Sequence, residues 1–229
     1  YNRLMKRLGF NEYQNLISGG KVLTRDTRGA KVVEAVDGRN IKLFRTKRLL
    51  SASRLNPYAA RFARNAALLT KLGIATVKVH AVYRVPEIER DIVVYRRLEG
   101  KTLRDTLSRS RDDARHNVLG KLAILIAALH RQGVLFRSIH FGNVLVTGNG
   151  YLGLIDVADL RKRRFGALTL RQRIRNFRHM LRYPEDRAAL KNFGVERFIS
   201  HYASADTIAP RDGAYLTAAL RNLLSDPTP

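Results

Sequence analysis

The order of short β-prone runs and turn signals in the first third of the chain is the strongest constraint on its fold. β-prone runs lie at 21–24, 31–36 and 40–44, and turn-forming residues separate them. The second turn contains Asp37-Gly38, and an Asp-Gly pair between β-prone runs is a strong hairpin signal because both residues suit a tight turn. The pattern predicts a three-stranded antiparallel meander.

A helix and two further strands are expected after this meander. Apolar residues recur at helical spacing over 57–72, at Tyr58, Phe62, Ala66 and Leu69, and Gly73 is a typical helix stop. β-prone runs return at 77–85 and 92–95. The chain up to residue 97 is therefore expected to form a unit of five strands and one helix.

The rest of the chain has mainly helical periodicity. A short helix is predicted at 102–107 and a long one at 112–132, whose buried stripe is Val118, Leu122, Leu125, Ile126 and Leu129. Strands at 144–146 and 151–155 flank a turn, and helices resume near residue 170. The sequence thus predicts an α+β protein divided into 1–97 and 98–229.

The charge of the chain points to an anionic partner. Lys and Arg number 43 against 19 Asp and Glu, a formal net charge of +24. The stretches 38–86 and 160–184 contain no acid but eleven and nine basic residues. Arg171, Arg175, Arg178 and Arg182 share one face of an expected helix, where like charges repel unless something negative lies opposite. A phosphorylated sugar, a nucleotide or an anionic membrane surface would fit; the alternative is an arginine-rich composition without a specific partner.

Several classes of function are excluded or disfavoured. The chain has no Cys, which excludes a disulfide scaffold, a thiolate zinc site and a cysteine nucleophile. Its longest apolar run, 122–129, is far shorter than the ~20 residues of a membrane-spanning helix. A helix-turn-helix signature and the interleaved aromatic and basic residues of single-strand platforms are both missing from the sequence, which argues against nucleic acid as the partner.

Two short motifs resemble those of small-molecule kinases. Kinases of this type carry H-G-D-x-H-x-G-N-x-L followed by a strand ending in [LI]-I-D. The chain has F-R-S-I-H-F-G-N-V-L at 136–145 and L-I-D at 154–156, so that His140, Gly142, Asn143 and Asp156 match. The resemblance implies a protein-kinase-like two-lobe fold: a five-stranded antiparallel N-lobe with one helix at 1–97, and a mainly helical C-lobe at 98–229.

Within that fold, the segment N-I-K-L-F-R at 40–45, the basic body and the small C-lobe resemble bacterial lipopolysaccharide-core kinases. These are the Kdo/heptose kinases, including the InaA-like or toluene-tolerance set. The resemblance implies ATP-dependent phosphoryl transfer to a sugar hydroxyl of an anionic glycolipid. It also implies a cytoplasmic location, with peripheral association at the anionic cytosolic face of the inner membrane, and a lipopolysaccharide precursor as partner.

The resemblance assigns a role to each matching residue. Asp156 would hold the Mg²⁺ that bridges the phosphates of ATP, and Asn143 would bind the second metal through its amide oxygen. The alternatives are a cap after a strand for Asp156 and plain turn chemistry for Asn143. Asp159 would be a substitute or helper carboxylate, or the start of a turn. His140 would donate to the γ-phosphate or stabilise its own turn.

The nucleotide would be held by residues of both segments. Lys42 lies in the third strand, where a kinase lysine grips the phosphates; the alternative is an exposed strand lysine. Arg97 and Glu99 would form the hinge near the adenine. The glycine-poor loop at Arg28 and Gly29 would cover the phosphates with help from basic side chains, at Arg25, Arg28 and Lys31. The face of Arg171, Arg175, Arg178 and Arg182 would meet the anionic acceptor.

Three departures from the kinase pattern leave two hypotheses open. Ser138 stands at the position of the catalytic aspartate and Phe136 at that of the first histidine. The helix at 57–72 has no acid to pair with Lys42; Asn65 is nearest to that position. The loop at Gly29 lacks the glycine-rich pattern. The chain is then either a weak or noncanonical kinase, because a lost general base slows transfer by about 10²–10⁴-fold without abolishing it, or an inactive pseudokinase that binds nucleotide or an envelope-biogenesis partner.

Overall fold

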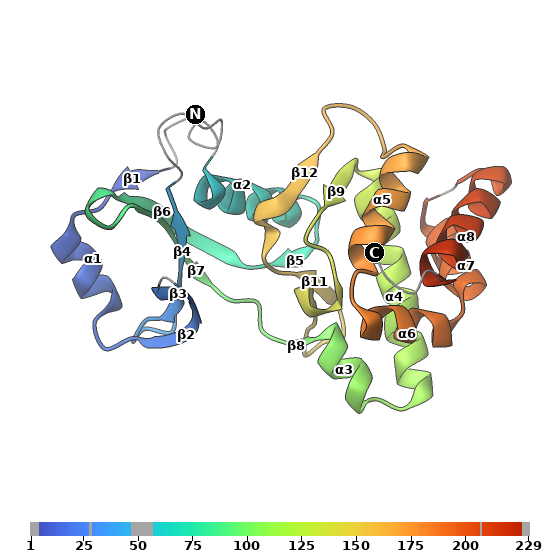
Figure 1. Cartoon of the computed structure of the whole chain (residues 1–229), viewed down its shortest axis with the longest axis horizontal. Helices are drawn as coiled ribbons and strands as arrows, with labels where there is room; N and C mark the ends of the chain where they lie inside the picture. The colour runs from blue at the N-terminus through green and yellow to red at the C-terminus, as the bar shows by residue number, and fades with distance from the viewer. Residues whose placement is uncertain (1–4, 28, 47–56, 207, 226–229) are drawn as a thin grey trace. The chain divides into compact units, whose positions relative to one another are not determined.

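A computed structural model describes residues 5–27, 29–46, 57–206 and 208–225 and has the expected α+β class (Figure 1). The chain divides into two compact units, Tyr1–Leu98 and Glu99–Pro229. The division falls one residue after the expected boundary. Within the described ranges, no helix is long and apolar enough to cross a membrane.

The first unit holds a six-stranded sheet of order β1-β6-β7-β4-β3-β2 and two helices. The strands of this unit are β1 (Lys6–Arg7), β2 (Lys21–Asp26), β3 (Gly29–Glu34), β4 (Asn40–Arg45), β5 (Ala75–Thr76), β6 (Lys78–Val85) and β7 (Arg90–Arg96). The helices are α1 (Phe10–Ile17) and α2 (Tyr58–Lys71), and a short 3-10 turn, η2 (Pro86–Ile88), joins β6 to β7. The five strands expected from the sequence pair in antiparallel fashion, from β2 to β3, β4, β7 and β6.

Two N-terminal elements were not expected. β1 pairs parallel to β6, and α1 follows it. A parallel pair of two residues leaves no periodic signal in a sequence. The helix does leave one, since Phe10, Tyr13 and Ile17 are spaced by three and four residues and the Glu12 carboxylate accepts from the Gly9 N–H at 2.8 Å.

Each face of this sheet is covered by one helix. On one face, Tyr13 of α1 packs with buried strand residues that include Val33, Ile41 and Ile92. On the other face lies α2, whose Phe62 ring is 6.0 Å from that of Phe44 and 5.4 Å from that of Tyr95. Because side chains alternate along a strand, Lys42 and Phe44 face α2 while Ile41 faces the opposite core.

The second unit is mainly helical. Its helices are α3 (Leu103–Arg109), α4 (Asp112–Arg131), α5 (Leu170–Met180), α6 (Pro184–Phe193), α7 (Val195–Asp206) and α8 (Pro210–Ser225), with 3-10 turns η3 (Phe141–Asn143) and η4 (Val157–Asp159). Its strands are β8 (Lys101–Thr102), β9 (Val134–Phe136), β10 (Val144–Val146), β11 (Leu152–Leu154) and β12 (Leu160–Lys162). The helices predicted at 102–107 and 112–132 are present within two residues at each end.

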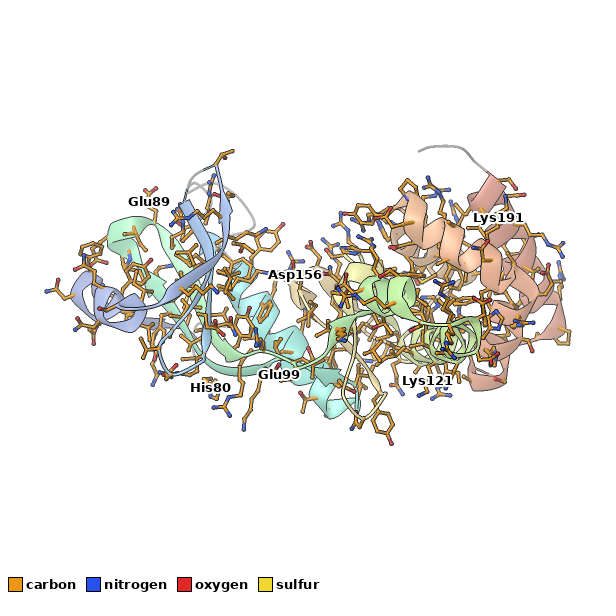
Figure 2. All side chains as sticks on the ribbon, turned by 90° about the horizontal axis from the view of Figure 1, so that it is seen from below. His80, Glu89, Glu99, Lys121, Asp156 and Lys191 are labelled. Atoms are coloured by element: carbon orange, nitrogen blue, oxygen red, sulfur yellow. The ribbon has the colours of Figure 1, made fainter. Side chains whose placement is uncertain are left out.

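Short strand pairs fix the loops of this unit. β10 pairs antiparallel with β8 and β11, and β12 pairs antiparallel with β9. The turn of the β10–β11 hairpin is tied to α4, because Lys121, labelled in Figure 2, donates to the Gly150 carbonyl at 2.9 Å. β8, β9 and β12 were not expected, since strands of two or three residues show no alternation and, unlike β10 and β11, no turn signal marks them as a hairpin.

A buried polar network joins α4, α5 and α7. The His130 ring lies 2.9 Å from the Tyr202 hydroxyl and 3.1 Å from the Asn176 amide oxygen. Burial lowers the pKa of His130 to about 3, so the ring is neutral at pH 7. Arg173 donates to Tyr202 and forms an ion pair with Asp206, whose side chain is only 2% exposed.

The basic helix is shorter than the sequence suggested and its arginines are not equivalent. α5 ends at Met180, so Arg182 lies beyond the helix, and Arg173 is buried. Arg171, Arg175 and Arg178 are exposed. The expected shared face is thus present for three of its four residues, and the fourth belongs to the loop that follows.

We expect Arg173→Met to lower the free energy of unfolding of the second unit by about 3–5 kcal/mol, because it leaves the buried carboxylate of Asp206 without its partner. Urea titration followed by circular dichroism measures this. Arg171→Met is the matched control, since the same substitution on the exposed side of α5 should change stability by less than about 0.5 kcal/mol. Equal losses in the two variants would contradict the assignment.

Candidate functional site

The candidate residues of the second unit gather on two segments, the loop between β9 and η3 and the end of β11. Ser138 and His140 lie on the loop, Asn143 ends η3, and Asp156, labelled in Figure 2, follows β11. The loop is short and half-buried, and the two segments are neighbours because β10 and β11 form a hairpin.

The hairpin brings Asn143 and Asp156 to the same end. Val144 pairs with Leu154, and the Ile155 N–H donates to the Asn143 carbonyl at 3.0 Å, so Asn143 takes part in the last backbone contact of the ladder and Asp156 directly follows it. The Asn143 side-chain NH₂ donates to the Ser138 carbonyl at 2.7 Å. That bond fixes the amide and leaves its oxygen as the end that can meet a cation. The thirteen-residue spacing in the sequence therefore corresponds to one hairpin, as expected.

Asp156 has a left-handed backbone conformation, with φ 54° and ψ 44°. Among the described residues, Glu89 is the other non-glycine residue with positive φ. Left-handed backbone costs free energy in residues other than glycine, least in Asp and Asn, and such positions cluster at functional sites. Asp156 precedes η4, but its side chain accepts no capping hydrogen bond from that turn. The carboxylate therefore does not cap η4.

His140 takes part in its own turn. Its Nδ1 accepts from the Gly142 N–H at 3.1 Å, and its ring meets that of Tyr183 edge-on with centroids 5.0 Å apart. Burial lowers the pKa of His140, with a raising contribution from Asp186 and lowering ones from arginines nearby. The neutral ring must carry its proton on Nε2, because a backbone N–H can only donate to Nδ1. The contacts match the turn-stabilising role, and Nε2–H remains a donor.

Ser138 stands at the position of the catalytic aspartate in the kinase motif, and the carboxylate of Asp159 lies within hydrogen-bond distance of it. Its hydroxyl donates to Asp159 Oδ2 at 3.1 Å, and both residues are half-buried. The pairing of β12 with β9 places Leu160 opposite Phe136, so Asp159 comes beside the residues that follow Phe136. The resemblance gives Asp159 as a substitute or helper carboxylate beside Asp156, and in the structure that carboxylate accepts from the Ser138 hydroxyl.

Two anchors that the sequence did not reveal hold the ends of this loop. The side chain of Asn176 spans the backbone of Phe136, accepting from its N–H at 3.4 Å and donating to its carbonyl at 2.8 Å. Asp186, which is fully buried, accepts two bonds of 3.0 Å from Arg104 and one of 3.0 Å from the Phe141 N–H. Pro184 marks a helix start near Asp186, but nothing local identifies partners more than forty residues away.

Arg182 is a third tie to the same loop. Its guanidinium donates to the carbonyls of Arg137 and, at 2.9 Å, of His179. It was expected among the anion-binding arginines, yet it lies half-buried against backbone carbonyls instead of on the exposed side of α5. Its contacts are those of a loop-positioning residue.

The first unit carries candidate residues on β3 and β4. Lys42 is only 8% exposed, and its Nζ lies 5.5 Å from the centroid of the Phe62 ring and 5.6 Å from that of Phe44. It is therefore not an ordinary exposed strand lysine. Gly29 begins β3 at the exposed end of a hairpin with φ 117°, while Arg28 lies outside the described residues.

The expected hinge residues lie on either side of the division between the units. Arg97 is 4.0 Å from the Glu34 carboxylate of β3, a contact within the first unit, and Glu99 is the first residue of the second unit. Asn65 of α2, the residue nearest to the missing glutamate, is half-buried. Both hinge side chains are exposed.

A separate cavity of about 720 Å³ lies in the second unit among α3, α4 and α6. Arg104, Asp186 and Phe141 form part of its wall, together with Arg115, His116 and Phe193. Ser138, Asn143 and Asp156 do not line it. The cavity therefore lies behind the loop anchor and not at the candidate site, and no motif in the sequence predicts it.

The described residues contain no cluster of three or more His, Asp or Glu side chains able to hold a metal ion by themselves. No protein-family model matches the chain, and no curated protein matches it. The assignment of the site therefore depends on its geometry and on the motifs that the sequence carries.

We expect Asp186→Ala to destabilise the second unit by about 2–4 kcal/mol, because Arg104 and the buried Phe141 N–H both lose their acceptor. Faster hydrogen exchange at the Phe141 amide is the specific signature. Glu185→Ala is the control, since Glu185 also contacts Arg104, at 3.2 Å, but is half exposed and should contribute less than about 1 kcal/mol. Unchanged exchange at Phe141 in the Asp186 variant would contradict the anchor.

Proposed function

We propose that this chain is a kinase-like protein of two lobes that binds Mg-ATP and moves its γ-phosphate to a sugar hydroxyl of an anionic glycolipid. The observation that carries the proposal is the pair formed by Asn143 and Asp156 at one end of the β10–β11 hairpin. The side-chain amide of Asn143 donates to the Ser138 carbonyl. The backbone of Asp156, which carries the carboxylate, has a left-handed conformation that costs free energy. Loop and hairpin together support a site for phosphoryl transfer, which needs positioning and charge neutralisation more than covalent chemistry.

The amide oxygen of Asn143 and the carboxylate of Asp156 suit a Mg²⁺ ion that is also bound to the phosphates of a nucleotide. Mg²⁺ prefers oxygen ligands and is commonly bound by one or two protein groups together with phosphate oxygens and water. One amide oxygen and one carboxylate meet that need, so a cluster of three acidic or histidine side chains is not required. Bound by Asn143 and Asp156, the ion would supply charge neutralisation of the β- and γ-phosphates.

The first unit carries candidate residues of its own for a phosphorylated ligand. Lys42, held between aromatic rings, would be the cation that pairs with the phosphates. Arg97 and Glu99 would border the adenine, and the segment of Arg28 and Gly29 would cover the phosphates. The exposed basic residues Arg25 and Lys31 on β2 and β3 would provide charge where glycine-rich backbone is missing.

The exposed arginines of α5 would face the acceptor and the anionic surface that carries it. Arg171 lies in the first turn of α5, where the helix dipole disfavours a cation, and that turn has no acid. A charge placed against the dipole is better explained by an external anion than by helix stability. Phe165, 74% exposed, follows four exposed basic residues at 161–164 and would insert among lipid headgroups.

A pseudokinase is the second candidate. Ser138 in place of a carboxylate and an α2 without any acid favour binding without efficient transfer. In that case the protein would bind nucleotide or a partner in envelope biogenesis. Nucleotide binding is common to both candidates, so it is tested first.

We expect Mg-ATP to stabilise the protein against heat. For a Kd of about 0.1 mM, a nucleotide concentration of about 1 mM adds about 1.4 kcal/mol, or roughly 3–6 °C in Tm. Asp156→Asn should abolish the magnesium-dependent part of the shift, and Asn is suitable because it tolerates the left-handed backbone of Asp156. Differential scanning fluorimetry with and without Mg²⁺ measures both effects.

Asp113→Asn is the matched control for this experiment. Asp113 is an exposed carboxylate in the first turn of α4, and its removal should leave the nucleotide shift intact. A nucleotide shift that is absent in the unaltered protein, or that survives in Asp156→Asn to the same extent as in the control, would sink the Mg-ATP assignment.

We expect the protein to bind vesicles that contain phosphatidylglycerol and not vesicles of phosphatidylcholine alone. Arg171→Glu combined with Arg175→Glu should weaken this binding by at least about 30-fold, since each arginine near an anionic surface contributes about 1 kcal/mol. The same change should not lower Tm, because Glu at 171 suits the first turn of α5 and position 175 is exposed. Vesicle flotation measures the binding; Arg211→Glu, at an exposed position of α8, is the control. Stronger and salt-steep binding to RNA than to vesicles would contradict a lipid surface.

A further inference from the structure

The contact between Ser138 and Asp159 has a defined direction. An ionised carboxylate can only accept hydrogen bonds, so in the 3.1 Å contact the Ser138 hydroxyl is the donor. The lone pairs of Ser138 Oγ are then the part of the hydroxyl that can receive a proton from another group. Ser138 and Asp159 together present an acceptor atom backed by a carboxylate.

The position of this pair is fixed by the backbone on both sides. The Ser138 carbonyl accepts from the Asn143 amide at 2.7 Å, which ties Ser138 to the residue proposed to hold Mg²⁺. Asp159 ends η4, the turn that begins directly after Asp156, and the β12–β9 pairing holds it beside the loop. The pair therefore lies next to both proposed metal-binding residues within a single unit.

We propose that Ser138 and Asp159 act together as the proton acceptor of the phosphoryl transfer, in place of the aspartate that the loop lacks. This rests on the proposed function, since it concerns the same site. Ser138 is the catalytic residue, and Asp159 is the positioning residue that receives the proton from it. A serine alone is far too weakly basic for this task, whereas a carboxylate one hydroxyl away can take up the proton that the serine passes on.

The hydroxyl proton of the acceptor moves to Ser138 Oγ while the proton of Ser138 moves to Asp159. The acceptor oxygen forms a bond to the γ-phosphorus, and the bond between that phosphorus and the β,γ-bridging oxygen breaks. The electron pair of the broken bond leaves with ADP, and Asp159 releases its proton to water after the products depart.

The test uses Mg-ATP hydrolysis by the full chain, with water as the acceptor. Asp159→Asn retains an oxygen that can accept from Ser138, so the contact survives, but the amide cannot take up a proton. Hydrolysis should fall by about 10²-fold, the lower end for general acid–base catalysis. The rise of rate with pH on the acid side should disappear, and the nucleotide-induced shift in Tm should stay unchanged.

A second variant separates proton transfer from a structural role. Ser138→Asp in the Asp159→Asn background restores a single carboxylate at the loop and should recover at least about one tenth of the original rate by supplying the general base directly. The background is needed because two carboxylates in contact would shift each other's pKa. A purely structural loss at position 159 would not be rescued by a charge at position 138. Ser138→Ala combined with Asp159→Asn should be no slower than Ser138→Ala alone.

The possible outcomes distinguish a failure of the proton relay from a failure of the proposed function. A rate and pH profile in Asp159→Asn equal to those of the unaltered protein would overturn the relay, as would failure of the Ser138→Asp rescue. Binding of nucleotide without any hydrolysis in the unaltered protein would also overturn it while leaving the nucleotide site in place. Absence of any nucleotide-induced shift in Tm would instead overturn the proposed function, and the relay with it.

Discussion

The candidate site depends on one buried side chain, the amide of Asn176. It makes the contacts of a neighbouring strand to Phe136, accepting from its N–H and donating to its carbonyl, and its oxygen also meets Nε2 of His130. Because an amide oxygen can only accept, His130 carries its proton on Nε2, and its Nδ1 accepts from the Tyr202 hydroxyl. Burial keeps the His130 ring neutral, so it accepts one hydrogen bond from Tyr202 and donates one to Asn176. The loop that bears Ser138 begins at this point.

The far end of the loop is held by charge instead of by neutral groups. Asp186 is fully buried, and three hydrogen bonds from Arg104 and the Phe141 N–H offset the cost of removing its carboxylate from water. Arg104 also stacks on the Tyr183 ring, with its guanidinium carbon 4.8 Å from the centroid. A buried ion pair adds little net stability, but it tolerates few alternative geometries. The ion pair holds the backbone of Phe141 in place, and because η3 begins at Phe141 it also positions Asn143.

How far the sequence predicts this protein depends on the sequence distance between interacting groups. Helices with a clear apolar stripe, such as α2 and α4, and strands flanked by turn signals follow from local patterns. The closeness of Asn143 and Asp156 also follows, because one hairpin spans the residues between them. The bond from Asp186 to Arg104 joins residues 82 positions apart, and no local pattern encodes it. The contact of Ser138 with Asp159 depends on the three-residue strands β9 and β12, which are too short to leave a periodic signal.

The five arginines between residues 171 and 182 illustrate the same limit for charge. The spacing of four of them suggests one cationic face, but the fold gives the five three different surroundings. Arg173 is buried against Asp206 and Tyr202, and Arg182 bonds to backbone carbonyls of the loop. Arg171, Arg175 and Arg178 are exposed, and Arg171 stands in the helix turn that suits a cation least. The first two are explained by the protein's own structure, so the case for an external anion depends on the other three.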